Sequence, residues 1–338
     1  MKESFKRTEI GSEFWSVPLA NEENRCFAPH TEWFLSGRSA LDAIIAEIKK
    51  SRDVRRAWLP SWCCDSMILP FLKHGLEVKF YPVLFKDGQL VQDVAQAREN
   101  EILFLMDYFG YTSSEYEGRR SGTVIRDVTH SVFSHTYADA DYYFGSLRKW
   151  CGFKTGGFAV GLQKNELSSD GAYVSLRERA MREKHDYMCG RSESKDFLRI
   201  FAQAEEHLET CGSAGADSED VSLALHLDIA HMKARRRKNA ARLLQTFRDI
   251  AVFKDVKEND CPLFVPVMIA AEKRDAFRRY LIERQIYLPV HWPISSVHGL
   301  DECTKEIYEG EISLVCDQRY DEKDMDRIVE TVNQFLKR

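Results

Sequence analysis

The fold is decided by two adjacent stretches, Asp141-Tyr-Tyr-Phe-Gly-Ser-Leu-Arg-Lys149 and Thr155-Gly-Gly-Phe-Ala-Val-Gly161. The first is aromatic and apolar, as expected of a buried strand, and it ends on a lysine. The second is a glycine-rich return that can lead the chain back beside that strand. A lysine held between a buried strand and such a return differs from the usual solvated surface lysine. This placement makes Lys149 the first candidate for a functional role.

Two stretches upstream also place chemically useful groups at the ends of predicted elements. Thr123-Val-Ile-Arg-Asp127 is a predicted buried strand that ends on a carboxylate, and Leu35-Ser-Gly-Arg-Ser-Ala-Leu41 opens an amphipathic helix. Together with Lys149, these are the parts needed to hold pyridoxal phosphate. The lysine amine forms the aldimine, the carboxylate partners the pyridinium nitrogen, and the helix N-terminus binds the phosphate.

The first half of the chain alternates predicted strands with predicted helices. Helices are predicted from Gly37 and over 63–74, and strands over 56–59, 78–81, 102–106, 123–125, 142–144 and 158–162. This alternation predicts crossover connections and an α/β fold with a mainly parallel central sheet. Ligands of such sheets bind beyond the carboxyl ends of the strands, where Asp127 and Lys149 both fall.

The second half has a different character, with long charged helices. We expect one helix over 220–242, strands over 263–269 and 286–290, and helices over 272–285 and 322–335. The basic run Lys233–Lys238 is interpreted as a solvated helix face. These features predict a large cofactor-binding domain with an N-terminal segment over 1–245, followed by a small α+β domain over 246–338.

Composition is that of an ordinary globular protein. The chain has 338 residues, 44% hydrophobic and 30% charged, with a formal net charge of −5. Such a charge does not favour nucleic acid or an anionic membrane as a partner. Nine cysteines without a C-x-x-C pair argue for reduced thiols and against a zinc site, and no signal segment or membrane span is visible. A cytoplasmic protein without a metal is the expectation.

Further motifs follow in a consistent order along the chain. They are Ser36-Gly-Arg-Ser-Ala-Leu41, Leu59-Pro-Ser-Trp-Cys-Cys-Asp65, Asp127-Val-Thr-His130 and Leu288-Pro-Val-His-Trp-Pro293. In this order and spacing the sequence resembles the DegT/StrS-like sugar aminotransferases, a family of fold-type I pyridoxal-phosphate enzymes. The resemblance covers most of the chain and implies a fold-type I architecture with a mainly parallel central sheet flanked by helices.

The resemblance also implies a set of site residues. Lys149 would be the catalytic Schiff-base lysine, and the cofactor would be bound by Gly37, Arg38, Ser39, Trp62, Cys64, Tyr108, Asp127, His130 and Ser146. Asp127 can alternatively cap a turn, and His130 can be a satisfied core residue. Trp62 and Tyr108 are equally consistent with stacking on the cofactor ring and with packing in the core.

This sequence departs from the family pattern in several places, as expected of a divergent branch. The family serine five residues before the lysine is Phe144 here, whereas Ser146 stands three before it, and Lys154-Thr-Gly-Gly157 lacks the usual glutamate. The family's Asn-Tyr-Arg segment, which contacts the cofactor across a dimer, is Asp217-Ser-Glu-Asp220. A penicillin-binding interpretation of Ser146, Lys149 and Lys154-Thr-Gly156 is rejected because these motifs overlap in one short loop.

The implied activity is transfer of an amine, with glutamate as the expected donor, to a keto-sugar that is expected to be nucleotide-linked. A homodimer with sites at the interface is implied as well. Two alternatives stay open. One is another pyridoxal-phosphate reaction, such as that of a lyase or a desulfurase, with Cys303 as the candidate nucleophile. The other is a non-catalytic protein with the same fold.

Overall fold

A computed structural model of the chain describes residues 7–86, 89–94, 98–112, 114–117, 122–135, 137–164 and 166–337. Seven of the described strands form one sheet, in the order β2-β11-β10-β9-β7-β3-β4. Their bounds are β2 Glu32–Phe34, β11 Gly157–Val160, β10 Tyr142–Ser146, β9 Thr123–Asp127, β7 Glu101–Met106, β3 Arg56–Pro60 and β4 Glu77–Tyr81. Pairing is parallel from β10 through β9, β7 and β3 to β4, and antiparallel from β10 to β11 and on to β2. The predicted α/β fold class is confirmed.

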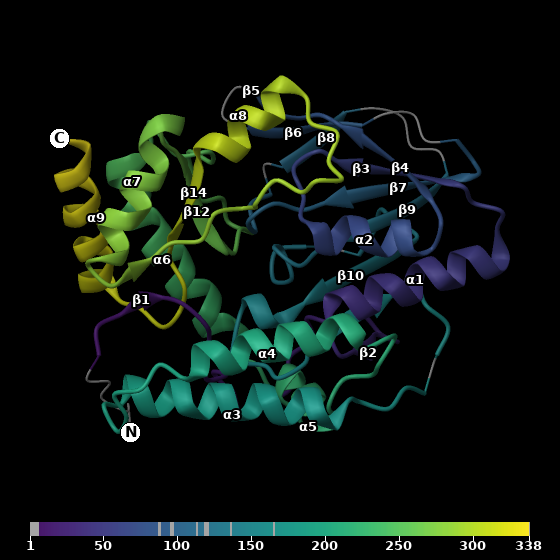
Figure 1. The fold of residues 1–338 in the computed structure, drawn as a ribbon, viewed down its shortest axis with the longest axis horizontal. Helices are drawn as coiled ribbons and strands as arrows, with labels where there is room; N and C mark the ends of the chain where they lie inside the picture. The colour runs from purple at the N-terminus through teal and green to yellow at the C-terminus, as the bar shows by residue number, and fades with distance from the viewer. Residues whose placement is uncertain are drawn as a thin grey trace.

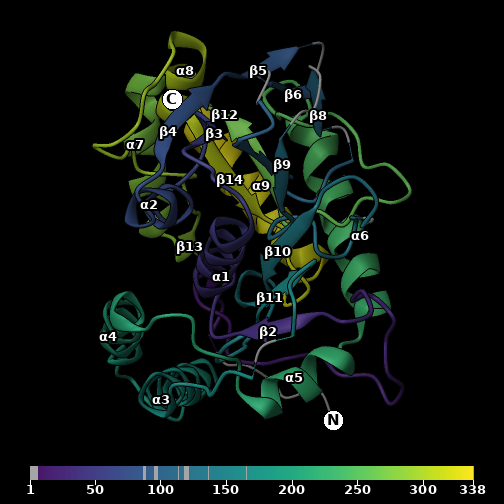
Figure 2. The same ribbon diagram turned by 90° about the vertical axis from the view of Figure 1, so that its right-hand side faces the viewer.

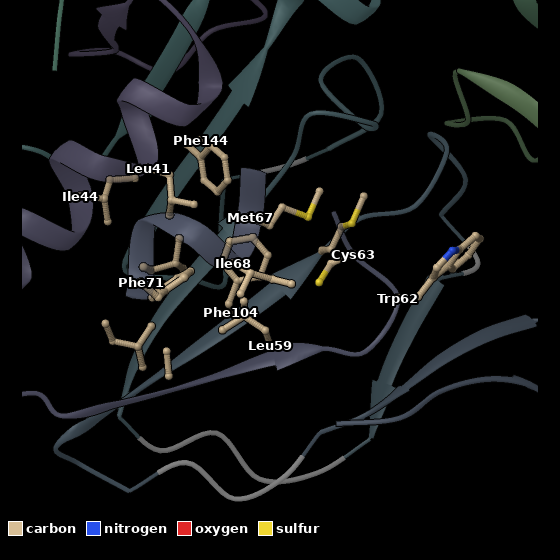
Figure 3. Packing of buried hydrophobic residues seen from close by; sticks show 14 of the residues in the cluster. Leu41, Ile44, Leu59, Trp62, Cys63, Met67, Ile68, Phe71, Phe104 and Phe144 are labelled. Carbon is tan, nitrogen blue, oxygen red and sulfur yellow. The ribbon is translucent and has the colours of Figure 1, made fainter. Parts of the chain in front are cut away.

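Helices cover both faces of this sheet. Helix α1 (Gly37–Ser51) and helix α2 (Asp65–Lys73) lie on one side, and α6 (Ile229–Phe247) lies on the other (Figure 2). The three-and-four spacing of Leu41, Ile44, Ile45 and Ile48 buries one face of α1, as the sequence predicts. Figure 3 shows α1 and α2 packing onto the sheet, with Leu41, Phe71 and Phe104 in one apolar cluster.

Helices α3 (Gly171–Met188) and α4 (Phe197–Thr210) form a hairpin beside α1 (Figure 1). The single helix predicted over 220–242 is wrong. The chain forms α5 (Ser218–Leu225) and then α6, with Leu227 buried between them. Asp228 explains the break, because its carboxylate accepts a hydrogen bond from the His231 amide and so caps a new helix.

The C-terminal part has its own apolar core. It contains β12 (Phe264–Met268) paired antiparallel with β14 (Glu311–Val315), and helices α7 (Ala271–Ile282), α8 (Glu302–Gly310) and α9 (Glu322–Leu336). The strand expected over 286–290 shortens to β13 (Ile286–Tyr287), which pairs with β1 (Ile10–Gly11) near the N-terminus. The last turns of α6, from Ala240 to Phe247, pack in this same core. The domain boundary predicted at residue 245 therefore falls inside a helix.

A second sheet was not expected from the sequence. It joins β5 (Val83–Lys86), β6 (Gln89–Asp93) and β8 (Ser114–Glu117) in that order, beside the edge of the large sheet. Among the described residues, no helix combines the length and the apolar character needed to cross a membrane.

A close backbone approach joins the large sheet to the start of α1. A Cβ atom on Gly157 would lie 2.1 Å from the carbonyl oxygen of Ser36, and one on Gly145 would lie 2.6 Å from the Phe158 ring. Neither neighbour of these glycines leaves room for a methyl group. The packing at this point therefore requires glycine.

We expect Gly157→Ala to destabilise the protein by about 2 kcal/mol or more, because the Ser36 backbone must move to admit the methyl group. The urea midpoint of unfolding measures the effect. Gly171→Ala is the matched control, since nothing lies within 4 Å of the Cβ that it would add. Similar midpoints for the two variants would show that the contact between Gly157 and Ser36 is not a packing constraint.

Candidate active site

A cavity of about 290 Å³ lies where β9 and β10 end. It brings together six of the residues predicted from the sequence, namely Gly37, Arg38, Cys64, Asp127, Ser146 and Lys149. These residues come from the start of α1, the start of α2 and the carboxyl ends of two parallel strands. This position is the one at which sheets of this kind bind their ligands.

Lys149 ends a short 3-10 turn, Leu147–Lys149, which directly follows β10. The Leu147 amide donates to the Gly156 carbonyl over 2.9 Å and the Trp150 amide donates to the Leu147 carbonyl, so the turn is held at both ends. The Lys149 side chain is exposed, and it also lines a second cavity of about 300 Å³. Its amine is therefore accessible to ligands in either cavity.

Asp127 is the last residue of β9 and is 2% exposed. Its Oδ1 accepts a hydrogen bond from the Thr129 amide over 2.8 Å. Burial raises the pKa of Asp127 to about 6, although the hydrogen bonds from Thr129 and the charge of Lys149 oppose the rise. A buried carboxylate of this kind is stabilised by a cationic partner, and a pyridinium nitrogen is such a partner.

The start of α1 forms one wall of the cavity. Ser36 caps the helix by accepting a hydrogen bond from the Ser39 amide over 3.1 Å, and the two hydroxyls also lie 3.1 Å apart. Ser39 is thereby engaged in the cap, whereas Gly37 and Arg38 face the cavity. The first turn of a helix carries amide groups and a partial positive charge suited to an anion.

Trp62 and Tyr108 lie away from this cavity. Both are fully buried, their rings stack with centroids 5.0 Å apart, and the Tyr108 hydroxyl donates to the Trp62 carbonyl. The Trp62 indole donates to the His291 carbonyl. Figure 3 shows Trp62 well apart from Met67 and Phe144, which both line the cavity. The structure thus favours core packing for this aromatic pair.

His130 is fully buried beside the same aromatic cluster, and its ring stacks on Trp292 with centroids 5.7 Å apart. Burial, with the nearby charge of Lys149, holds the pKa of His130 well below its usual value, which favours the neutral form of the ring. Neither ring nitrogen meets a hydrogen-bond partner among the described residues. Buried polar atoms are normally satisfied, so His130 is not an ordinary core histidine.

Several cavity residues were missed by the sequence analysis. They are Glu13, Ser66, Met67, Thr129, Phe144, Arg148, Arg177, Glu205 and Leu208. Arg148 and Thr129 could have been suspected because they adjoin Lys149 and Asp127. Ser66, Met67 and Phe144 lie in elements that the sequence analysis predicts. No local pattern marks the rest, because α3, α4 and the N-terminal segment reach the cavity only through tertiary packing.

Lys154, the other lysine of this loop, is engaged in ion pairs with carboxylates. Its amine contacts the carboxylates of Asp217 at 3.1 Å and Glu219 at 2.5 Å, and these contacts raise its pKa despite burial. Thr155 donates to Asp220 through both its amide and its hydroxyl over 2.7 Å. The stretch Asp217–Asp220 therefore holds the loop that follows Lys149.

The second cavity lies beside the C-terminal core. Its lining includes the cations Arg236, Arg278 and Arg319 together with Asp317 and Lys149. The prediction of a solvated helix face is wrong at Arg236, which is fully buried and donates to Gln318 and to the carbonyls of residues 262 and 263. Helix periodicity explains the error, since Arg236 shares the inward face with Met232 and Ala240.

One group of side chains has the composition of a metal site. Asp170, His207 and Cys211 lie close together, and none of them lines the cavities that Lys149 joins. Asp170 caps α3 through the Tyr173 amide and also accepts from His207 over 3.1 Å and from Cys211 over 3.4 Å. Each of these contacts is an ordinary hydrogen bond, which accounts for the cluster without a metal ion.

Comparison with known proteins was made by sequence and by structure. No family model matches the sequence, and no curated protein matches it. Helicobacter pylori PseC, an aminotransferase involved in the biosynthesis of pseudoaminic acid, has the same fold, with 15% identity, coverage of 96% of this chain and 100% of that chain, and a TM-score of 0.63. A DegT DnrJ EryC1 StrS aminotransferase from Brucella abortus has 12% identity, coverage of 91% and 86%, and a TM-score of 0.56.

A third similar structure is that of Spr1654 from Streptococcus pneumoniae, which is described as a sugar aminotransferase, in its pyridoxal-phosphate (PLP) form. It has 14% identity and a TM-score of 0.60, and the match covers 95% of this chain and 92% of that chain. The chain thus has the fold of the sugar aminotransferases of this group over nearly its whole length. The resemblance noted in the sequence is confirmed at the level of the fold.

The raised pKa of Asp127 predicts a stability effect in the cofactor-free protein. A group whose pKa is higher in the folded than in the unfolded state destabilises the fold above the folded value, and the penalty fades as pH falls toward the unfolded value. Asp127→Asn removes the charge and keeps an acceptor for the Thr129 amide. We expect it to stabilise the cofactor-free protein by about 2 to 3 kcal/mol at neutral pH.

Urea unfolding of the cofactor-free protein, followed at neutral pH and again near pH 5, measures this effect, and the gain should shrink at the lower pH. Asp255→Asn is the control, because Asp255 is exposed at the surface and pairs with Arg248. A loss of stability in Asp127→Asn at neutral pH would mean that burial of the ionised Asp127 carboxylate does not destabilise the fold.

Proposed function

We propose that this chain is a pyridoxal-phosphate-dependent aminotransferase that moves an amine from an amino acid to a keto-sugar. Glutamate is the expected donor, a nucleotide-linked keto-sugar is the expected acceptor, and Lys149 is the residue that attaches the cofactor. The observation that carries the proposal is the single cavity shared by Lys149, Asp127, Ser146 and the first turn of α1. The sugar aminotransferases that share this fold support the same class of reaction.

The cavity fits the cofactor in four respects. Lys149 supplies an accessible amine, and Asp127 supplies a buried carboxylate whose charged form is favoured by the charge of Lys149. The start of α1 and Ser146 offer amide and hydroxyl donors to a phosphate. The unsatisfied ring nitrogens of His130 lie within electrostatic range of Lys149. When bound, pyridoxal phosphate supplies an electron sink for a substrate carbanion.

The residues of this chain would then act as follows. Lys149 would hold the cofactor through its Nζ atom, and the amine, once freed by the amino donor, would act as the general base and then the general acid of the 1,3-proton shift. Asp127 keeps the pyridine nitrogen protonated, since an opposite charge at close range favours the charged form. Ser146 and the first turn of α1 hold the phosphate and so fix the orientation of the ring.

The second cavity supports an anionic substrate beside Lys149. Arg236, Arg278 and Arg319 contribute three cations to its wall, against the carboxylates of Glu13 and Asp317. An excess of positive charge suits the carboxylates of an amino-acid donor and the diphosphate of a nucleotide-linked acceptor. The homodimer implied by the resemblance belongs to the same proposal.

One observation favours testing a second function, that of a desulfurase. Cys303, the nucleophile considered for a desulfurase, lies exposed in α8 and lines neither cavity, whereas Cys64 lines the cavity that holds Lys149. A thiol in this position is the minimum that a desulfurase requires. The assays below separate this reaction from transamination and from a non-catalytic protein.

We expect borohydride to fix pyridoxal phosphate covalently on Lys149, because reduction converts the reversible link into a stable amine. Peptide mass spectrometry locates the label. Lys149→Ala should prevent labelling, while Lys154, whose amine is paired with Asp217 and Glu219, should stay unlabelled in the parent protein. Label recovered on Lys154 would refute the assignment.

We also expect glutamate to yield 2-oxoglutarate when nucleotide-linked keto-sugars are supplied, and Asp127→Asn to lose most of this turnover. Each tenfold loss corresponds to about 1.4 kcal/mol of barrier. Release of sulfide or pyruvate from cysteine or serine is followed in parallel. Sulfide or pyruvate without 2-oxoglutarate would assign the protein to the lyases, and no spectral response to any amino acid would assign it to the non-catalytic class.

A further inference from the structure

Three arginines from separate elements meet at one end of the Lys149 cavity. Arg38 is the second residue of α1, Arg148 adjoins Lys149, and Arg177 lies in the middle of α3. Similar charges repel each other, so such a group is maintained only when an anion is bound between its members or when carboxylates compensate it.

Carboxylates compensate this group only in part. Glu205 of α4 is the shared partner, with its Oε1 atom 2.7 Å from Arg148 Nη1 and 3.9 Å from Arg177 Nη1. Counted over the whole cavity, four cations face three carboxylates, which are Arg38, Arg148, Lys149 and Arg177 against Glu13, Asp127 and Glu205. The proposed function assigns Asp127 to the pyridine nitrogen of the cofactor, so Asp127 does not compensate the arginines. The part of the cavity that the three arginines line therefore has an excess of positive charge.

Arg177 is a buried cation whose charge is poorly compensated. It is 4% exposed, its guanidinium lies over the Phe201 ring at 4.8 Å, and its Nη2 donates to the Phe153 carbonyl over 3.3 Å. Burial, followed by the charge of Arg148, lowers the pKa of Arg177. A buried cation with one carbonyl and one distant carboxylate as partners is poorly compensated, and a bound anion would stabilise it.

The hydrogen-bonding capacity of the cluster is also incomplete. The Nε atoms of Arg38, Arg148 and Arg177 are all buried, and none meets an acceptor among the described residues. A buried N–H group without an acceptor is costly and rare. Three such groups on the wall of one cavity indicate a ligand with several acceptor oxygens, and phosphate matches the forked donors of arginine.

The acidic segment Asp217–Asp220 is engaged within the chain, because its carboxylates hold Lys154 and Thr155. An acidic segment engaged in this way is unsuited to a phosphate.

We propose that Arg148 and Arg177 form an anion subsite that binds the phosphate of the cofactor within one chain, beside the first turn of α1. The subsite extends the proposed function and rests on it for the identity of the ligand. Glu205 contacts both arginines, so a bound phosphate would compete with it for Arg148, which is the more exposed of the pair.

The test compares three probes on the full-length protein: pyridoxal 5′-phosphate, pyridoxal and inorganic phosphate. Arg148→Gln removes one guanidinium, and Arg177→Lys keeps the charge but loses the forked donors. Arg179→Gln is the matched control, because Arg179 lies on the exposed side of α3 and pairs with Glu183 over 2.9 Å. Equilibrium dialysis gives the affinities, and circular dichroism verifies that each variant is folded.

We expect Arg148→Gln to weaken the binding of pyridoxal 5′-phosphate about tenfold or more, as the loss of a charge-assisted hydrogen bond implies. Inorganic phosphate should lose affinity in parallel, pyridoxal should bind as it does to the parent, and Arg179→Gln should change none of the three. Arg177→Lys should fall between the parent and Arg148→Gln.

Unchanged affinity of Arg148→Gln for both phosphate probes would overturn the proposal. Equal weakening of pyridoxal and pyridoxal 5′-phosphate would overturn it too, by assigning Arg148 a purely structural role. If neither pyridoxal 5′-phosphate nor pyridoxal attaches to Lys149 in the parent protein, the proposed function is refuted instead. In that case the binding of inorganic phosphate alone decides whether the anion subsite exists.

Discussion

The contact between Gly157 and Ser36 is the constraint on which the arrangement of the site depends. Strand β11 lies between β10 and β2, and at Gly157 its backbone touches the residue that caps α1. Because Gly157 is paired with Ser146, the same contact sets the end of β10 against the start of α1. The amine of Lys149 and the helix N-terminus can therefore share one cavity. A side chain at Gly157 would separate them.

The site contains groups that lower the stability of the cofactor-free protein. Asp127 is a buried carboxylate with a raised pKa, Arg177 is a buried cation with a lowered pKa, and His130 lacks partners for both ring nitrogens. Perturbed and unsatisfied groups of this kind gather at functional sites, where a ligand supplies the missing interactions. Asp127 and Arg177 line the cavity that contains Lys149, and the charge of Lys149 acts on His130, whereas Lys154 and Asp107 are fully paired within the chain.

Much of the fold followed from local pattern. The helix at Gly37, the strand that ends on Asp127, the aromatic strand before Lys149 and the glycine-rich return could be predicted because their periodicity and end signals agree. The end of that aromatic strand at Ser146 and the 3-10 turn that carries Lys149 were not predicted. The prediction of one helix over 220–242 was wrong because Asp228 caps a new helix, and an internal cap is easily read as one more polar residue. Trp62 and Tyr108 could not be placed, since aromatic residues suit a core and a binding site equally well.

The sequence by itself determined the α/β class, the order of the strands along the chain and the residues at their carboxyl ends, because these depend on interactions between near neighbours. Only the tertiary structure decided which of these ends meet, that α3 and α4 bring Arg177 and Glu205 beside Lys149, and that Arg236 is buried. Contacts between residues far apart in the chain depend on how whole helices pack, and no local pattern records that packing.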